Sequence, residues 1–201
     1  IRDSYETKAA AKLYKAGKLT NAHKELDTGL SAWNLAMGSQ ELYDWLDAEP
    51  QLFHPGDLDY IHSVERISKF SNVISINGGV QLDLMGQENA ESTGTRQLSG
   101  VGGQMDFLEG AYRSKGGKGF ICINSSRVTK DGERKSNILA TIPGGSTISA
   151  PCQMSRNAFS TPQAIVKPLS VCVTSNASVK SSPRPPFAPA ISFCQLYSVP
   201  P

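Results

Sequence analysis

The chain has 201 residues, of which 39% are hydrophobic and 19% are charged, and its formal net charge is +2 at pH 7. That length suffices for one domain, or for one domain and a tail, with a sizeable core. The near balance of charge argues against a nucleic-acid reader and against a polybasic membrane anchor. No run of residues is apolar over the roughly 18 positions of a transmembrane helix, and no signal-peptide pattern opens the chain. We therefore predict a cytoplasmic protein without nucleic-acid or membrane partners.

Helical and strand patterns alternate over the first 150 residues. A helix is expected over 3–21, with Asp3 or Ser4 as its cap and Gly17 near its end. A second helix is expected over 39–50, capped by Ser39 and terminated by Pro50. Short apolar runs predict strands over 33–37, 72–77, 80–86, 119–124, 137–142 and 146–150. Asp131-Gly132 predicts a hairpin turn, and the mixture indicates a layered α/β domain.

The composition changes abruptly after Phe159. Residues 160–201 contain eight Pro and eight Ser but no Gly, Asp or Glu. Proline at that density sustains neither a helix nor a central strand. Two interpretations stay open: an irregular, disordered Pro/Ser-rich tail, or a segment read in a shifted frame or joined from elsewhere. The four cysteines have no CxxC pair and no histidine at a ligand-like offset, so no zinc site is predicted.

Three glycines gather immediately before a predicted helix over 104–114, namely Gly100, Gly102 and Gly103. Backbone without side-chain cover can cradle a phosphate, form an oxyanion hole or make a tight turn. The spacing is neither a Walker A loop nor a GxGxxG dinucleotide fingerprint, which disfavours a nucleotide-binding oxidoreductase. Spacing alone favours a structural turn that enters the helix.

A longer series of motifs surrounds these glycines. In order they are SIN (75–77), DL and GQ (83–87), NAES (89–92), SGVGGQMDF (99–107) and SKGG (114–117), followed by the turn 130–132. This series resembles the C-terminal domain of the acetyl-CoA hydrolase/transferase family, which includes 4-hydroxybutyrate, butyryl and succinate CoA-transferases. GSQELYDWLDAEP, at 38–50, resembles a further family motif. The resemblance covers about residues 3–159.

The resemblance implies an open-sheet α/β CoA-transferase fold of the NagB/RpiA-like type. Residues 1–159 would be an incomplete C-terminal domain, and 160–201 a disordered or frame-shifted tail. The implied partners are an acyl-CoA, a small carboxylate and a missing N-terminal domain of the same enzyme, and a homo-oligomer stays open. Coenzyme A is expected as substrate and product, with no cofactor.

The resemblance also implies a mechanism. A glutamate attacks the acyl-CoA thioester and then carries CoA as a glutamyl-CoA thioester to a second carboxylate, and interception by water would make the enzyme a hydrolase. The resemblance puts Gly103 in the oxyanion hole, with Gly100 and Gly102 giving room for the backbone to approach. Ser99 and Lys130 match CoA or substrate contacts.

His62 stands where many members of the family have an active-site asparagine. For His62 the alternative is a satisfied structural histidine, and for Lys130 it is a solvated turn. His23 and His54 have no such match. The nucleophilic glutamate is expected upstream of Ile1, with Glu6 set aside as a helical residue, so this fragment alone is predicted to be inactive. A noncatalytic CoA- or metabolite-binding remnant is the alternative function.

Overall fold

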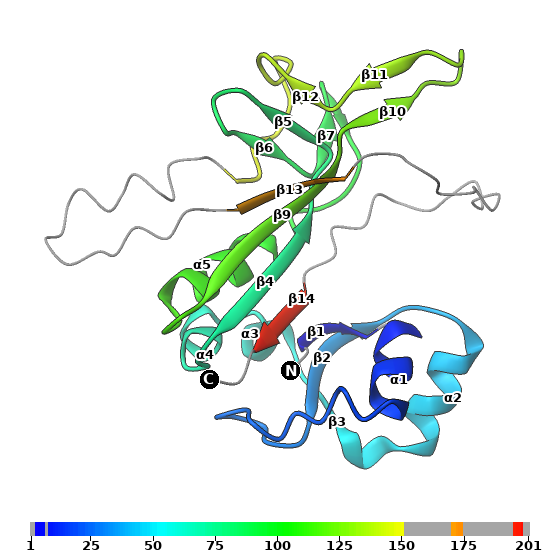
Figure 1. Cartoon of the computed structure of the whole chain (residues 1–201), viewed down its shortest axis with the longest axis vertical. Helices are drawn as coiled ribbons and strands as arrows, with labels where there is room; N and C mark the ends of the chain where they lie inside the picture. The colour runs from blue at the N-terminus through cyan, green and yellow to red at the C-terminus, as the bar shows by residue number, and fades with distance from the viewer. Residues whose placement is uncertain (1–2, 7, 151–169, 175–194, 199–201) are drawn as a thin grey trace, which may run out of the picture. The chain divides into compact units, whose positions relative to one another are not determined.

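The computed structural model describes residues 3–6, 8–150, 170–174 and 195–198 (Figure 1). The chain divides into two compact units. The first is built from residues 1–76, 106–119 and 194–201, and the second from residues 77–105 and 120–193. Among the described residues, no helix is both long enough and apolar enough to cross a membrane.

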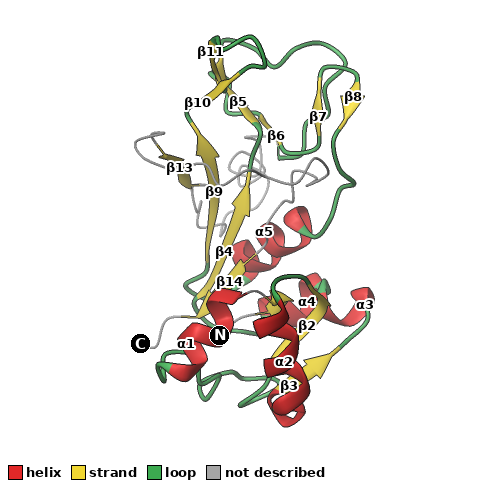
Figure 2. Cartoon of the chain, turned by 90° about the vertical axis from the view of Figure 1, so that its right-hand side faces the viewer, coloured by secondary structure: helices red, strands yellow, loops and turns green. Residues whose placement is uncertain are grey.

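Short helices and strands make up the described part of the chain, and strands predominate after residue 72 (Figure 2). In order they are β1 (Asp3–Glu6), α1 (Lys8–Lys15), β2 (Ser31–Ala36), α2 (Gln40–Ala48), a 3-10 turn (Pro50–Leu52), β3 (Phe53–Pro55), α3 (Leu58–Ile61), α4 (Val64–Ser68), β4 (Val73–Gly78), β5 (Gln81–Asp83), β6 (Glu88–Asn89), β7 (Ser92–Thr93), β8 (Arg96–Gln97), α5 (Gln104–Arg113), β9 (Lys118–Asn124), β10 (Ser126–Val128), β11 (Arg134–Ser136), β12 (Ile138–Leu139), β13 (Ser170–Thr174) and β14 (Gln195–Ser198). The expected α/β class, with open sheets, is confirmed.

The first sheet has the order β1-β2-β3, and all its pairs are parallel. Its first strand corrects the predicted helix over 3–21, because Asp3–Glu6 pair with β2 and the helix begins only at Lys8. Asp3 and Ser4 therefore do not cap it, and Glu6 is a strand residue. Tertiary pairing overrides helix propensity here. Gly17 follows the helix with a φ of +66°, as its predicted role at the end requires.

The second sheet has the order β13-β9-β4-β14. β13 pairs in parallel with β9, and β14 pairs antiparallel with β4. Both outer strands belong to the segment predicted as an irregular tail, so two short stretches of that segment are strands. The rest of 160–201 lies outside the described residues, and its disorder or frame shift stays a prediction.

Three predicted strands are shorter than expected or absent. The run 80–86 forms a strand only over β5, because Asp83 Oδ1 accepts hydrogen bonds from the backbone N–H of Met85 and of Gln87, each at 2.9 Å. This side-chain turn competes with the ladder and ends it. Within 137–142 only β12 is a strand, and within 146–150 only Ala150 forms a bridge, to Glu88.

The main core of the first unit is centred on α5, which runs alongside β4 in both views (Figures 1 and 2). Phe107 and Ala111 lie one turn apart on the buried face of α5 and are fully buried. They pack in one cluster with Ala32, Ile61, Ile67, Phe70 and Val73. At the end of the helix the Ser114 hydroxyl donates to the Phe70 carbonyl at 2.7 Å.

A partly buried carboxylate, that of Asp27, joins the loop after α1 to the short helices α3 and α4. Asp27 Oδ2 accepts from Arg66 Nη2 at 2.6 Å, and its carboxylate also contacts His54 Nδ1 and the Tyr60 hydroxyl. Burial by itself would raise the pKa of Asp27, but these partners outweigh burial and hold the pKa below its ordinary value. His54 is thus part of a structural ion cluster.

Substituting Gly110 tests the packing of α5. A Cβ at this position would lie 2.6 Å from Ile67 Cβ and closer still to Ile67 Cγ2. Gly110→Ala should therefore destabilise the chain by about 2 kcal/mol, since overpacking outweighs the gain in helix propensity. Gly144→Ala is the matched control, because a Cβ there meets nothing within 4 Å. Urea unfolding measures both, and equal stability of the two variants would contradict the packing.

Candidate active site

The predicted glycine loop, residues 99–103, connects β8 to the first residue of α5. Gly102 has a φ of +59°, a backbone conformation that side chains rarely adopt, so a glycine is required there. A Cβ at Gly100 or Gly102 would meet nothing within 4 Å, which leaves these backbone positions open to an approaching group. Gly103 is buried, directly before the helix.

The beginning of the glycine loop is fixed by the carbonyl of Glu91. That oxygen accepts hydrogen bonds from the backbone N–H of Leu98 at 2.7 Å and of Ser99 at 3.2 Å. The Gln97 side chain adds a bond from Nε2 to the Ser99 carbonyl at 2.6 Å. The Ser99 hydroxyl donates to the Gly100 carbonyl at 3.1 Å. Ser99 is therefore held by backbone bonds while its hydroxyl stays at the edge of the loop.

The end of the glycine loop is fixed by Glu88, which lies three residues before Glu91 in the chain. Gln104, the first residue of α5, donates from Nε2 to Glu88 Oε2 at 2.8 Å. Gln104 is 2% exposed and Glu88 is 1% exposed, so this bond is shielded from water. Residues 88–91, which we name the anchor segment, thus hold both ends of the glycine loop.

Asn89 fixes the shape of the anchor segment. Its Oδ1 accepts from the backbone N–H of Glu91 and of Ser92, each at 3.0 Å. Its Nδ2 donates to the Ser92 carbonyl at 2.8 Å and to Gln81 Oε1 at 3.2 Å. Asn89 is completely buried, so these bonds satisfy an amide that would otherwise be costly to bury. The NAES motif is therefore a folded turn whose asparagine is its centre.

Glu88 carries an unusual charge state. Burial raises the pKa of this carboxyl to about 8; the hydrogen bond from Gln104 lowers it only in part, and the nearby Glu91 raises it further. Glu88 is therefore protonated at neutral pH. Its Oε1 is buried and has no hydrogen-bond partner among the described residues. Sequence reasoning missed Glu88 and Gln104, because only the fold brings an acid in a two-residue strand against the start of α5.

His62 lies in the first unit, between two polar side chains. Its Nε2 lies 3.2 Å from Asn34 Nδ2, and its Nδ1 lies 3.6 Å from Asp106 Oδ2. Because an amide nitrogen only donates, Nε2 accepts and the ring proton lies on Nδ1, facing Asp106. The ring also meets Phe107 edge to face at 5.2 Å. Both ring nitrogens of His62 thus face protein side chains.

The His62–Asp106 pair has shifted pKa values on both sides. Burial lowers the pKa of His62, against the opposing effect of Asp106, so the ring is neutral at pH 7. Burial also raises the pKa of Asp106, with His62 lowering it and Glu109 raising it. Asp106 lies in the first turn of α5, the helix that the glycine loop enters.

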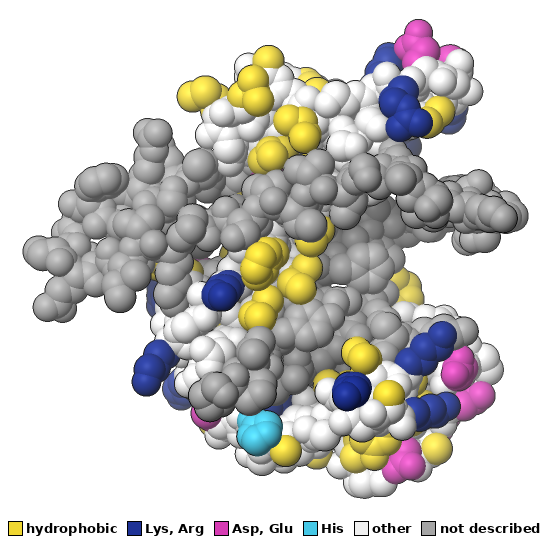
Figure 3. All heavy atoms as spheres, viewed as in Figure 1, with side chains coloured by type: hydrophobic (Ala, Val, Ile, Leu, Met, Phe, Trp, Pro, Cys, Tyr) yellow, Lys and Arg dark blue, Asp and Glu magenta, His cyan; other side chains and the backbone are white. Residues whose placement is uncertain are grey.

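Lys130 lies in the predicted hairpin turn between β10 and β11, which is confirmed. Gly132 has a φ of +80°, and its N–H bonds the Thr129 carbonyl at 3.1 Å. Lys130 is exposed, and charged side chains of both signs gather over this hairpin (Figure 3). Within the described part of the chain, no hydrogen bond or ion pair links Lys130 to Ser99 or the glycine loop. The structure thus brings together Ser99, Gly100, Gly102 and Gly103, but joins neither Lys130 nor His62 to them.

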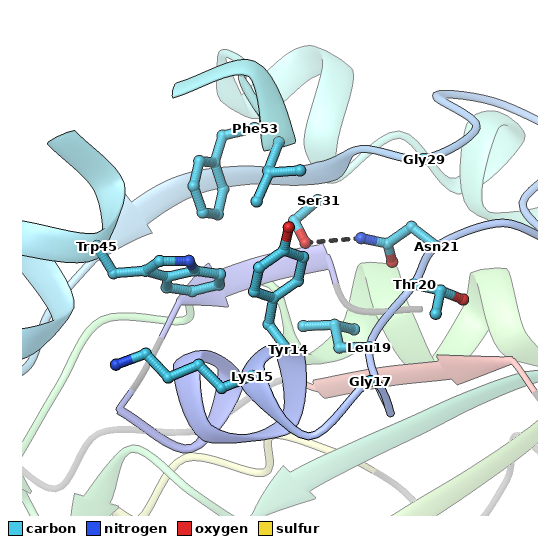
Figure 4. Close-up of a pocket in the computed structure, with 11 residues that line it drawn as sticks. Tyr14, Lys15, Gly17, Leu19, Thr20, Asn21, Gly29, Ser31, Trp45 and Phe53 are labelled. Carbon is cyan, nitrogen blue, oxygen red and sulfur yellow. Dashed lines mark hydrogen bonds between the residues drawn. The ribbon is translucent and has the colours of Figure 1, made fainter. Parts of the chain in front are cut away.

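A cavity of about 500 Å³ opens in the first unit, and no predicted site residue lines it (Figure 4). Trp45 lies between Tyr14, with ring centroids 5.4 Å apart, and Phe53, at 4.8 Å. The polar side of the cavity includes Asn21, whose Nδ2 donates to Ser31 Oγ at 2.9 Å. These aromatic rings also pack on the core of α1 and α2, so the cavity adjoins a structural cluster.

The profile of the acetyl-CoA hydrolase/transferase C-terminal domain matches residues 38–161. The chain belongs to the acetyl-CoA hydrolase/transferase family. It is similar to the butyryl-CoA:acetate CoA-transferase of Anaerostipes caccae, with 43% identity over 67% of this chain and 30% of that protein. It is also similar to the 4-hydroxybutyrate coenzyme A transferase of Clostridium kluyveri, with 45% identity over 57% of this chain and 26% of that protein.

Two solved structures also align with most of this chain. The crystal structure of RipA from Yersinia pestis aligns with a TM-score of 0.65 and 36% identity, over 74% of this chain and 32% of RipA. The 4-hydroxybutyrate CoA-transferase of Porphyromonas gingivalis aligns with a TM-score of 0.56 and 30% identity, over 70% of this chain and 32% of that one. The family resemblance of the motifs is confirmed, and the chain spans about a third or less of these relatives.

Substituting Asn89 tests whether its side chain holds the anchor segment in its folded form. Asn89→Ala should lower the free energy of unfolding by about 3 kcal/mol, because two buried N–H groups lose their acceptor. Gln51→Ala removes an exposed amide and should change stability by less than about 0.5 kcal/mol. Urea titration of both variants measures the difference. A loss in Asn89→Ala no larger than in the control would contradict the role of Asn89.

The His62–Asp106 pair gives a prediction with a definite sign. Because Asp106 favours the charged imidazole, Asp106→Asn should lower the pKa of His62 further below its ordinary 6.5. An NMR titration of the histidine ring signals measures this shift. Asp131→Asn, on the exposed hairpin, should leave the titration of His62 unchanged. A rise in the His62 midpoint in Asp106→Asn would show that the two groups do not interact in this way.

Proposed function

We propose that this chain is the glycine-loop part of an acyl-CoA:carboxylate CoA-transferase acting on short acyl-CoAs. The observation that carries the proposal is the loop 99–103, held at both ends by the anchor segment, in a chain of the acetyl-CoA hydrolase/transferase family. Residues 1–159 would act as the C-terminal domain, of open-sheet NagB/RpiA-like type, together with an N-terminal domain. The named reactions of the relatives support a carboxylate as the CoA acceptor.

The proposed reaction proceeds through a covalent relay. A glutamate oxygen attacks the thioester carbon, the C–S bond breaks, and an acyl-glutamyl anhydride forms with release of CoA thiolate. The thiolate attacks the glutamyl carbon and releases the first carboxylate, which leaves a glutamyl-CoA thioester. The second carboxylate attacks this thioester to form a new anhydride. CoA thiolate then takes the new acyl group and restores the glutamate.

Each attack places negative charge on a former carbonyl oxygen. We assign the backbone N–H of Gly103 as a donor to that oxygen, at the point where the loop enters α5. A donor fixed in advance costs little reorganisation during the reaction and is typically worth about 3 kcal/mol. The fixing comes from the bonds at Ser99 and Gln104, on either side of the glycines. Gly100 and Gly102, with open space at their Cβ positions, leave room for the thioester.

The nucleophile is a glutamate of the segment that leads into α1. Following the resemblance of the motifs, we propose that this glutamate stands upstream of Ile1. The reason for setting Glu6 aside no longer holds, because Glu6 lies in β1 rather than in the helix. Reduction of the enzyme with borohydride during turnover converts a glutamyl-CoA thioester into an alcohol, and peptide mapping then distinguishes Glu6 from an upstream glutamate.

Ser99, Lys130 and His62, the remaining predicted site residues, have supporting roles in the proposed reaction. Ser99 offers a hydroxyl at the edge of the loop, and Lys130 offers an exposed point charge suited to a CoA phosphate or a carboxylate. We assign His62 a neutral ring held between Asn34 and Asp106, so a direct bond to the acyl group requires one of these contacts to open. Where water replaces the second carboxylate, the same site hydrolyses acyl-CoA.

A side chain at Gly103 tests the assignment. In the complete enzyme, Gly103→Ala should reduce kcat/KM for CoA transfer from acetyl-CoA to butyrate by roughly 100-fold, because a methyl group blocks approach to the N–H. Gly144→Ala should leave the rate unchanged. Circular dichroism establishes that both variants are folded. A Gly103→Ala enzyme of full activity would overturn the oxyanion role, and a wild type that binds acetyl-CoA without turnover would support a noncatalytic binding protein instead.

A further inference from the structure

Glu88 is a buried acid that the relay described above does not use. It lies in β6, a strand of two residues that are both buried. A Cβ added to Gly79 would lie 2.8 Å from Glu88 Oε1 and 3.1 Å from Ile121 Cγ2, so only a glycine leaves room for the carboxyl there. The carboxyl is thus enclosed between a glycine, an isoleucine and the side-chain amide of Gln104.

The hydrogen bond to Gln104 identifies which oxygen carries the proton. The amide nitrogen of Gln104 donates to Oε2, so Oε2 acts as the carbonyl-type acceptor. We assign the proton of the neutral acid to Oε1, the oxygen without a partner among the described residues. In this form Glu88 contributes an acceptor to Gln104 without adding a charge beside the glycine loop.

Ionisation of Glu88 would change the surroundings of the loop. Glu91 is the titratable group that acts on Glu88, and its charge has the same sign. No cation among the described residues forms an ion pair with Glu88. A buried carboxylate would therefore be stabilised mainly by Gln104, and it would oppose the negative charge that develops at the neighbouring Gly103 N–H.

We propose that Glu88 is a positioning residue of the glycine loop, which it holds through its buried hydrogen bond with Gln104. This inference rests on the proposed oxyanion role of the loop. It predicts that the loop loses its arrangement, and the enzyme its rate, when Glu88 ionises. Glu88→Gln keeps an acceptor oxygen for Gln104 and cannot ionise. It therefore separates the effect of the hydrogen bond to Gln104 from the effect of a charge on Glu88.

The test compares the pH profile of kcat for CoA transfer from acetyl-CoA to butyrate in the complete enzyme. In the wild type kcat should fall with a midpoint near pH 8, to about one-tenth at pH 9, because a single proton is lost. In Glu88→Gln this fall should disappear while kcat at pH 7 stays within about threefold of wild type. The control is Glu133→Gln, an exposed acid that pairs with Lys135, and it should keep the wild-type profile.

An independent readout does not require turnover. The amide NMR signals of Gly103 and Gln104 should titrate with the same midpoint near 8 in the wild type and stay constant in Glu88→Gln. If Glu88→Gln retains the wild-type pH profile, or if these amides do not titrate, the positioning role is wrong while the proposed transferase function stands. If no variant transfers CoA and the amides still titrate, the proposed function fails and the link between Glu88 and the loop is supported.

Discussion

The site depends on a small set of buried hydrogen bonds made by residues 88–91. The carbonyl of Glu91 holds the start of the glycine loop, and the carboxyl of Glu88 holds its end through Gln104. Asn89, between them, keeps the segment folded with five hydrogen bonds of its own side chain. A loop rich in glycine has high conformational entropy, so its geometry comes from its fixed ends rather than from its own residues.

This arrangement would let the backbone of a glycine-rich loop act as the preorganised donor proposed above. The backbone of the loop enters α5 directly, and α5 is packed into the core of the first unit through Phe107 and Ala111. Asp106 in the first turn of the same helix faces His62. One helix therefore connects the core, the glycine loop and His62, which the sequence predicted as a site residue. Burial also sets the charge of this region, because it keeps both Glu88 and His62 neutral at pH 7.

The sequence predicted the features that local signals determine. The glycine loop, α5 and the hairpin at Asp131-Gly132 each have their own turn or period signal, and all three are found. The strand Asp3–Glu6 was missed because parallel pairing with β2, far along the chain, outweighs local helix propensity. The end of β5 was missed because it depends on the side chain of Asp83. The contact of Glu88 with Gln104 was not predictable either, because it joins residues sixteen positions apart across a turn.

Native-state hydrogen exchange of the Leu98 and Ser99 amides tests the central claim most directly. Both amides bond the carbonyl of Glu91, so the start of the glycine loop and the anchor segment should open together. The account predicts equal free energies of opening for Leu98, Ser99, Glu91 and Ser92. Exchange of Leu98 and Ser99 near the unprotected rate, with Glu91 and Ser92 still protected, would show that the anchor segment does not hold the loop.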